Sequence, residues 1–153
     1  MTLTKDNYFL PAAQRQYMGV SQFKDFEACE AAALARISGA MPPKSSPALL
    51  IGSYVDAWFE GTLDAFCAAH PELYKRDGTL KAEYAVAVKV IDRVQRDPLF
   101  MQYMDGQKQV IMTGQIEGVP VKIKVDALHP DMIVDGKVMR NFEPVYKPGM
   151  GRL

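Results

Sequence analysis

Two acidic residues and a lysine near the end of the chain have the types and spacing of a divalent-cation site: Asp126, Asp135 and Lys137. Asp126 lies in one predicted strand, and Asp135 and Lys137 lie in the next. Side chains alternate along a strand, so Asp135 and Lys137 share a face, and a tight turn brings Asp126 to the same side. The pattern predicts two carboxylates and an ammonium group converging at one end of a sheet.

This set of groups has a chemical meaning. Two carboxylates a few ångströms apart form a hard oxygen site that suits Mg²⁺ or Mn²⁺. Such a cation polarises a phosphoryl oxygen and lowers the pKa of a bound water molecule. A neighbouring lysine orients that water or stabilises developing negative charge. The spacing alone leaves open a simpler alternative, in which the three residues are solvated hairpin residues that form a surface ion pair.

The second half of the chain contains the strands that must position these residues. Val- and Ile-rich runs alternate with turn residues at Glu117-Gly118 and at His129-Pro130-Asp131. This pattern is typical of an antiparallel meander. The predicted strands are Lys108–Thr113, Val119–Leu128 and Met132–Val138.

The first half of the chain is predicted to be helical, with a loop of prolines and serines between Gly39 and Ser46. We expect an α+β fold in which N-terminal helices pack on the three-stranded meander. One domain of 153 residues is expected, with a helical part (1–106), a sheet part (107–138) and an irregular tail (139–153). The predicted helices are Gln22–Ile37, Pro47–Phe59, Leu63–Ala69, Lys81–Arg96 and Pro98–Met104.

Three further charged residues stand out by their position. Asp56 lies in an otherwise apolar helix beside Val55 and Trp58, and a buried carboxylate needs a partner. Lys122 and Lys124 share the Asp126 face of their strand, where they either meet DNA phosphates or form a solvated edge. From residue 107 onward the chain has seven Lys and Arg against five Asp and Glu, so the sheet half is slightly basic.

The composition excludes several classes of protein. Charge is balanced at 18 basic and 18 acidic residues, unlike an abundant DNA-packaging protein. No apolar run reaches the roughly 18–20 residues of a membrane span, and no secretory signal is recognisable. Cys29 and Cys67 match no metal-ligand spacing and are expected to be buried, reduced thiols of a cytoplasmic protein. His70 and His129 each precede a proline, which favours turn residues over ligands.

Several elements resemble, in the right order, the PD-(D/E)xK nuclease superfamily, in its branch of phage exonuclease VIII-like nucleases. The resemblance spans about Ser21 to Tyr146 and includes a strand with Asp, a turn, and a strand with Asp-x-Lys. The matching stretches are Lys124-Val125-Asp126, Ile133-Val134-Asp135-Gly136-Lys137, Gly52-Ser53-Tyr54-Val55-Asp56, Ser21-Gln22-Phe23 and Gly114-Gln115-Ile116-Glu117-Gly118-Val119.

The resemblance implies an incomplete restriction-endonuclease-like core that cleaves DNA with Mg²⁺ or Mn²⁺. It makes Asp126, Asp135 and Lys137 catalytic, with Lys137 positioning or activating the attacking water. Asp126 and Asp135 would bind the metal, together with the backbone carbonyl of Gly136. Asp56 would lie beside the metal where relatives usually have a histidine.

The chain departs from these relatives after Lys137, because they continue into a helix with a Gln-x-x-x-Tyr element. Here sixteen residues follow, and they include Pro144, Pro148, Gly149 and Gly151. We therefore expect either a metal-dependent DNA nuclease of phage or prophage origin or a shortened, non-catalytic relative. The latter would bind DNA or a protein, as a phage inhibitor of host defence does, and a partner or second copy would cover the exposed sheet. A fragment of a longer enzyme is a third possibility.

Overall fold

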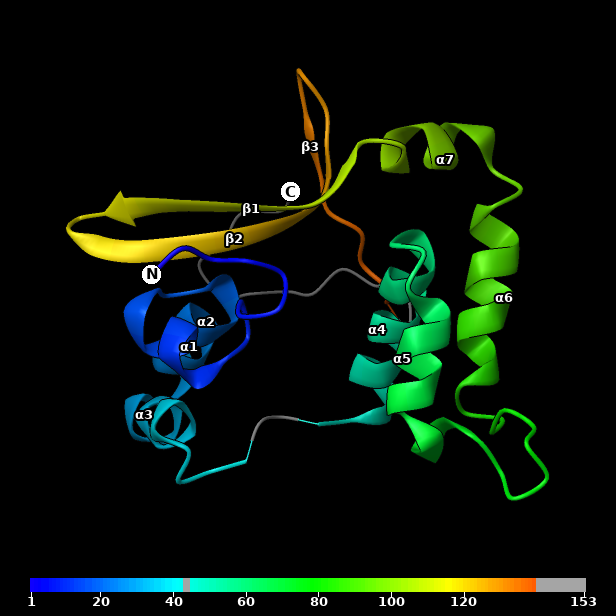
Figure 1. Cartoon of the computed structure of the whole chain (residues 1–153), viewed down its shortest axis with the longest axis horizontal. Helices are drawn as coiled ribbons and strands as arrows, with labels where there is room; N and C mark the ends of the chain where they lie inside the picture. The colour runs from blue at the N-terminus through cyan, green and yellow to red at the C-terminus, as the bar shows by residue number, and fades with distance from the viewer. Residues whose placement is uncertain (43–44, 140–153) are drawn as a thin grey trace, which may run out of the picture.

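The computed structural model describes residues 1–42 and 45–139, which form an α+β fold. Within those residues, helices come first along the chain and one antiparallel sheet comes last, in the order β1-β2-β3 (Figure 1). This confirms the predicted fold class. The elements are α1 (Pro11–Gln16), α2 (Val20–Ala28), α3 (Glu30–Ser38), α4 (Pro47–Phe59), α5 (Leu63–Ala69), the 3-10 helix η1 (Pro71–Leu73), α6 (Ala85–Val94), α7 (Pro98–Met104), β1 (Gln107–Ile116), β2 (Val119–Leu128) and β3 (Ile133–Val134).

The helices α1 to α6 form two groups, one under the long β1–β2 hairpin and one beyond the end at which β1 begins (Figure 1). Helices α1, α2 and α3 lie under the hairpin, and α4, α5 and α6 form the second group, from which α7 leads into β1. Backbone hydrogen bonds attach the first group to β2. Met18 N donates to Pro120 O at 2.9 Å, and Lys122 N donates to Met18 O at 3.0 Å.

Helix α4 begins where the sequence predicts. Ser46 caps it by accepting a hydrogen bond from Leu49 N at 3.2 Å, and Pro47 takes the first helical position. Tyr54 and Val55 of this helix are buried in the main core. This core lies between α4, η1 and α6 and not under the sheet. Of the helices in the described ranges, none is long and apolar enough to cross a bilayer.

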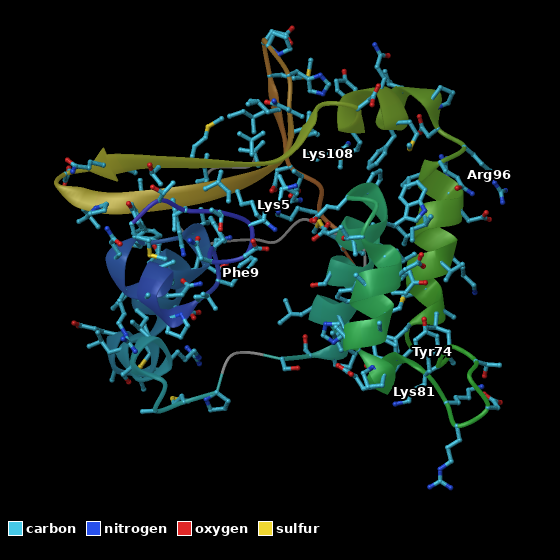
Figure 2. All side chains as sticks on the ribbon, viewed as in Figure 1. Lys5, Phe9, Tyr74, Lys81, Arg96 and Lys108 are labelled. Carbon is cyan, nitrogen blue, oxygen red and sulfur yellow. The ribbon has the colours of Figure 1, made fainter. Side chains whose placement is uncertain are left out.

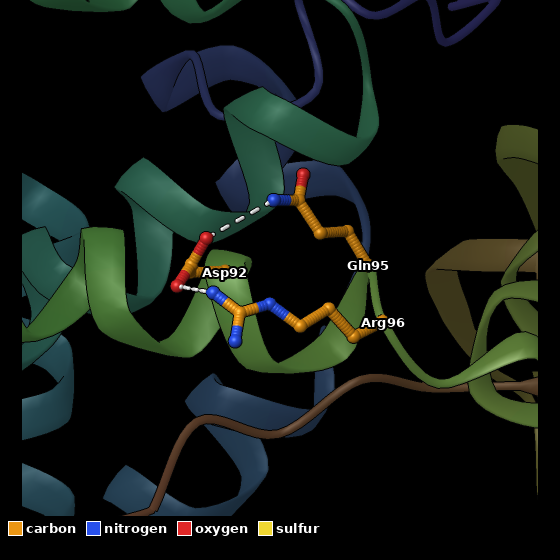
Figure 3. Close-up of polar contacts among 3 residues, drawn as sticks. All are labelled: Asp92, Gln95 and Arg96. Atoms are coloured by element: carbon orange, nitrogen blue, oxygen red, sulfur yellow. Dashed lines mark hydrogen bonds and ion pairs between the residues drawn. The ribbon is translucent and has the colours of Figure 1, made fainter.

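Helix α6 is shorter than the predicted Lys81–Arg96. A turn precedes it, because Tyr84 N donates to Lys81 O at 2.9 Å, and the helix runs from Ala85 to Val94. At its C-terminal end, Asp92 accepts a hydrogen bond from Gln95 Nε2 at 3.2 Å and pairs with Arg96 (Figure 3). These contacts accompany the change of direction from α6 to α7.

The predicted helix Gln22–Ile37 is wrong as one element, because it is broken at Cys29. Cys29 has an extended backbone with φ −167°, so α3 folds back against α2. Arg36 Nη1 pairs with Asp25 Oδ2 at 3.4 Å across the break. Packing between the two short helices therefore overrides the helix propensity of the segment. Cys29 is exposed and Cys67 half-buried, which corrects the expectation of two buried thiols.

The hairpin is longer than predicted at β1 and matches the prediction at β2. Its turn is Glu117-Gly118, with φ of 48° and 80° at the two residues, as in the turns that suit twisted hairpins. The third strand is much shorter than the predicted Met132–Val138. Only Ile133 and Val134 pair with β2, opposite Leu128 and Ala127. The predicted irregular tail lies outside the described residues except for Met139.

Candidate active site

Asp126 lies near the end of β2, where the segment after β3 returns to it. The backbone N–H of Gly136 donates a hydrogen bond to Asp126 Oδ2 at 2.8 Å. Strand pairing with β2 ends at Val134, and this bond holds the segment that follows against β2. The Asp126 carboxylate is therefore fixed directly against the Asp135-Gly136-Lys137 segment.

Asp135 and Lys137 form an ion pair at the surface. Their side chains are 53% and 68% exposed, and Lys137 Nζ also lies 3.4 Å from the carbonyl oxygen of Gly136. The predicted proximity of these two side chains is thus present. The two side chains lie close together in a segment that follows β3 and makes no ladder pair with β2. Their proximity therefore does not come from the predicted alternation of side chains along a strand.

A cleft of about 600 Å³ joins α4 to β2. Asp56 lines it from α4 and Asp126 lines it from β2, although the two residues are far apart in sequence. The cleft also contains the ammonium-bearing side chain of Lys124. The other polar residues that line it are Ser53, Glu60, Thr62, His70 and Gln109.

The surroundings of Asp56 disfavour its charged form. Burial of the carboxyl, followed by repulsion from Asp126 and Glu60, raises the pKa of Asp56 from 3.8 to about 6. Lys137 and Lys124 oppose this shift. Asp56 as a whole is exposed, which corrects the expectation of a buried carboxylate, and the neighbouring walls of the cleft remove only part of the water around its carboxyl. Two carboxylates that repel each other in this way attract a cation.

The two lysines on the Asp126 face have different surroundings. Lys124 lines the cleft, with Nζ 5.1 Å from the ring centre of Phe9, which lies beneath the hairpin (Figure 2). Lys122 is only 2% exposed. Its Nζ donates to Tyr8 O at 2.6 Å and lies 4.5 Å from the Tyr8 ring centre. In this arrangement Lys122 cannot reach a DNA phosphate, because the N-terminal segment covers it.

Sequence reasoning did not single out Glu60 and Gln109, which are among the residues that line the cleft. Glu60 follows Asp56 by four residues, a spacing that places both on one face of a helix, so α4 itself carried that signal. Gln109 has φ 54° within β1, and its side chain is buried. No sequence pattern indicates a left-handed glutamine inside a strand.

The donors of the cleft fit a hard divalent cation. Asp56 and Asp126 supply carboxylate oxygens, and Gln109 Oε1 is buried with no hydrogen-bond partner in the part of the chain that the structure describes. Oxygen donors of this kind suit Mg²⁺ and Mn²⁺. Among the described residues, no three acidic, histidine or cysteine side chains already enclose an ion site. The structure therefore brings Asp56 and Asp126 to one cleft and leaves Asp135 paired with Lys137 beside it.

Comparison with known proteins gives two findings. Residues 19–147 match a family described as "PDDEXK-like domain of unknown function (DUF3799)". A crystal structure from Eubacterium rectale, named "Putative exonuclease", is similar in fold with a TM-score of 0.82 and 45% sequence identity. The similarity covers 85% of this chain and 51% of that one, so this chain spans about half the length of that protein. No curated protein matches the chain.

The family match covers most of the chain, including α4, the hairpin and the Asp-Gly-Lys segment. It confirms the resemblance to PD-(D/E)xK nucleases that the sequence motifs indicate. The similar structure agrees with it at the level of the fold. The chain belongs to the PDDEXK-like domain family.

Proposed function

We propose that this chain is the core of a metal-dependent deoxyribonuclease that hydrolyses phosphodiester bonds with Mg²⁺ or Mn²⁺. The hydrogen bond from Gly136 N to Asp126 Oδ2 carries this proposal most directly. It brings the Asp of β2 against the Asp-x-Lys segment, which is the arrangement that the family name describes. The nucleases of this family generally use divalent metals, which supports the choice of cofactor.

In this proposal Asp126 and Asp135 hold the cation, with help from Asp56 and from the backbone carbonyl of Gly136. The cation would supply charge for the phosphoryl oxygens and lower the pKa of a water molecule. Lys137, which already lies beside Asp135 and the Gly136 carbonyl, positions that water and stabilises developing negative charge. Lys124, at the cleft, is the lysine placed to contact the DNA backbone.

Asp135 must exchange one partner for another in this proposal. Its ion pair with Lys137 joins two exposed side chains, and such pairs contribute little to stability. The Asp135 carboxylate can therefore turn from Lys137 to a cation at small cost. Lys137 would then lose only this exposed ion pair and would be free to position a water molecule.

A nuclease assay with a matched control tests the proposal. Asp135→Asn should lower Mg²⁺-dependent cleavage of duplex DNA by at least about tenfold to 100-fold, because it removes a ligand charge from the metal site. Asp131→Asn, in the exposed turn before β3, should cleave at the wild-type rate. A comparison of linear and circular DNA substrates distinguishes exonuclease cleavage, which needs a DNA end, from endonuclease cleavage within the strand. Wild-type cleavage by Asp135→Asn would contradict the site assignment.

The setting of this nuclease is part of the same proposal. The resemblance to phage exonuclease VIII-like nucleases supports a phage or prophage origin. Free thiols at Cys29 and Cys67 support a reducing compartment such as the cytoplasm. DNA is the proposed partner, supported by family membership and by the Lys124 side chain in the cleft.

A second candidate is a binding protein that does not cut, and the apolar surface of the sheet favours it. Exposed apolar side chains on the sheet suit a protein partner or a second copy of the chain. A binder would retain DNA or protein in the presence of Mg²⁺ or Mn²⁺ without shortening the DNA, for example as a phage inhibitor of host defence. The exposed side chains are Ile116, Val119, Ile123 and Ile133.

A further inference from the structure

Gln109 is a conformational exception within β1. Its backbone φ is 54°, in the left-handed region that residues other than glycine and asparagine rarely adopt. The ladder pairs Lys108–Ala127 and Val110–Val125 flank it, so Gln109 stands opposite Asp126, and the two do not form a ladder pair. The strand thus departs from regular pairing at the position that faces the candidate metal ligand.

The side chain of Gln109 is also an exception. It is 5% exposed, and its Oε1 is shielded from solvent and accepts no hydrogen bond from the residues that the structure describes. A buried amide oxygen without a donor costs free energy. Backbone strain and an unsatisfied buried group at one residue are typical of functional sites, where a ligand completes the structure.

The neighbours of Gln109 decide which ligand fits. Gln109 lines the same cleft as Asp56 and Asp126, so the unsatisfied oxygen belongs to a site that already contains two carboxylates. An amide oxygen beside carboxylates cannot be satisfied by them, because ionised carboxylates only accept hydrogen bonds. Lys124 also lines the cleft, but its ammonium donates no hydrogen bond to Gln109 Oε1 among the described residues. A divalent cation would satisfy all three groups, and side-chain amide oxygens are accepted ligands of hard divalent cations.

We propose that Gln109 Oε1 is a neutral oxygen ligand for the divalent cation held at Asp126 and Asp135 with help from Asp56. This rests on the proposed function, because it adds a ligand to the same metal site. Directly opposite residues of an antiparallel pair share a face of the sheet, so the position of Gln109 opposite Asp126 places its amide at the cleft. Nothing in the pattern of Asp126 and the Asp-Gly-Lys segment requires this residue.

Mn²⁺ titration of the full chain without DNA tests the proposal, with affinity read by calorimetry or by the electron paramagnetic resonance of free Mn²⁺. Gln109→Leu should weaken Mn²⁺ binding by about tenfold, the lower end of what loss of a supporting ligand costs. Gln109→Asn suits a left-handed backbone and keeps an amide one methylene shorter, so it should fold as wild type and still bind Mn²⁺ more weakly. Gln115→Leu, exposed on the same strand, should bind as wild type.

The set of variants separates failure of this inference from failure of the proposed function. If Asp126→Asn abolishes Mn²⁺ binding while Gln109→Leu and Gln109→Asn both bind as wild type, the metal site stands and the role of Gln109 is wrong. If wild type binds no Mn²⁺, or Asp126→Asn binds as wild type, the proposed metal site fails and the role of Gln109 fails with it. Circular dichroism shows that each variant is folded, and Gln109→Asn serves where Gln109→Leu does not fold.

Discussion

The backbone N–H of Gly136 and the Oδ2 atom of Asp126 are joined by a hydrogen bond of 2.8 Å. This contact follows directly after the β2–β3 ladder and fixes the carboxylate of β2 against the Asp-Gly-Lys segment. It also leaves room at residue 136, because a Cβ there would lie 3.7 Å from Asp126 Oδ2 and from Met104 Cε. Those are ordinary contact distances, so a Cβ at residue 136 would fit. The contribution of this residue to stability comes from its backbone N–H, not from its lack of a side chain.

Removing the acceptor should destabilise the fold while a side chain at Gly136 should not. Asp126→Ala leaves the Gly136 N–H without its charged acceptor, and the free energy of unfolding should fall by about 1–3 kcal/mol. Gly136→Ala should change it by less than about 0.5 kcal/mol. Urea denaturation followed by circular dichroism measures both. Removing Asp126 also relieves its repulsion of the Asp56 carboxylate, so the comparison is made at about pH 5, where Asp56 is mostly protonated. Equal stability of Asp126→Ala and wild type at that pH would show that the hydrogen bond contributes nothing.

Stability should depend on pH through Asp56. Its pKa is about 6 in the folded chain against 3.8 as the ordinary value, so the folded state binds the proton more tightly. The free energy of unfolding should therefore fall as pH rises from about 4 to about 6 and then level off. Asp56→Asn should remove this decline and be more stable than wild type at pH 7 by about 1 kcal/mol, a value reduced for solvent contact.

Denaturation of wild type, Asp56→Asn and Asp131→Asn between pH 4 and pH 8 measures this dependence. Asp131 is exposed in a turn, so its variant should follow the wild-type profile. A profile of Asp56→Asn that still declines between pH 4 and pH 6 as steeply as wild type would assign the titration to another group.

Lys122 should act on stability and not on DNA binding. Its buried ammonium satisfies the carbonyl oxygen of Tyr8, so Lys122→Met leaves that oxygen buried without a donor. The free energy of unfolding should fall by about 1–3 kcal/mol. In the folded variant, DNA affinity measured by fluorescence anisotropy should equal that of wild type. If Lys122→Met bound DNA more weakly but were as stable as wild type, Lys122 would be a DNA contact and not a stabilising residue.

Lys124 should behave in the opposite way. It lines the cleft beside Asp126, so Lys124→Met should weaken DNA binding at every sequence tested. The slope of log affinity against log salt should become shallower by about 1, as expected when one phosphate contact is lost. Anisotropy titrations between low and moderate salt, with Ca²⁺ in place of Mg²⁺ to prevent cleavage, measure the slope. An unchanged slope would remove Lys124 from the DNA contact.

Local patterns predicted some of these features, and tertiary packing determined the others. Pro47 begins α4 as its type predicts, and the period-2 pattern defines all of β2. The break at Cys29 could not be predicted, because it depends on packing between α2 and α3. The proximity of Asp126 to the Asp-Gly-Lys segment follows from spacing and turn signals. The meeting of Asp56 with Asp126 follows from the resemblance alone, because it joins elements about 70 residues apart.

Anomalous diffraction from crystals of the full chain grown or soaked with Mn²⁺ tests the central claim most directly. The account predicts a Mn²⁺ peak bonded to carboxylate oxygens of Asp126 and Asp135, with Asp56 within reach and Lys137 turned away from Asp135. The peak should disappear in Asp126→Asn crystals prepared in the same way. Mn²⁺ bound elsewhere on the chain, or no Mn²⁺ at Asp126 in crystals of the wild-type protein, would contradict it.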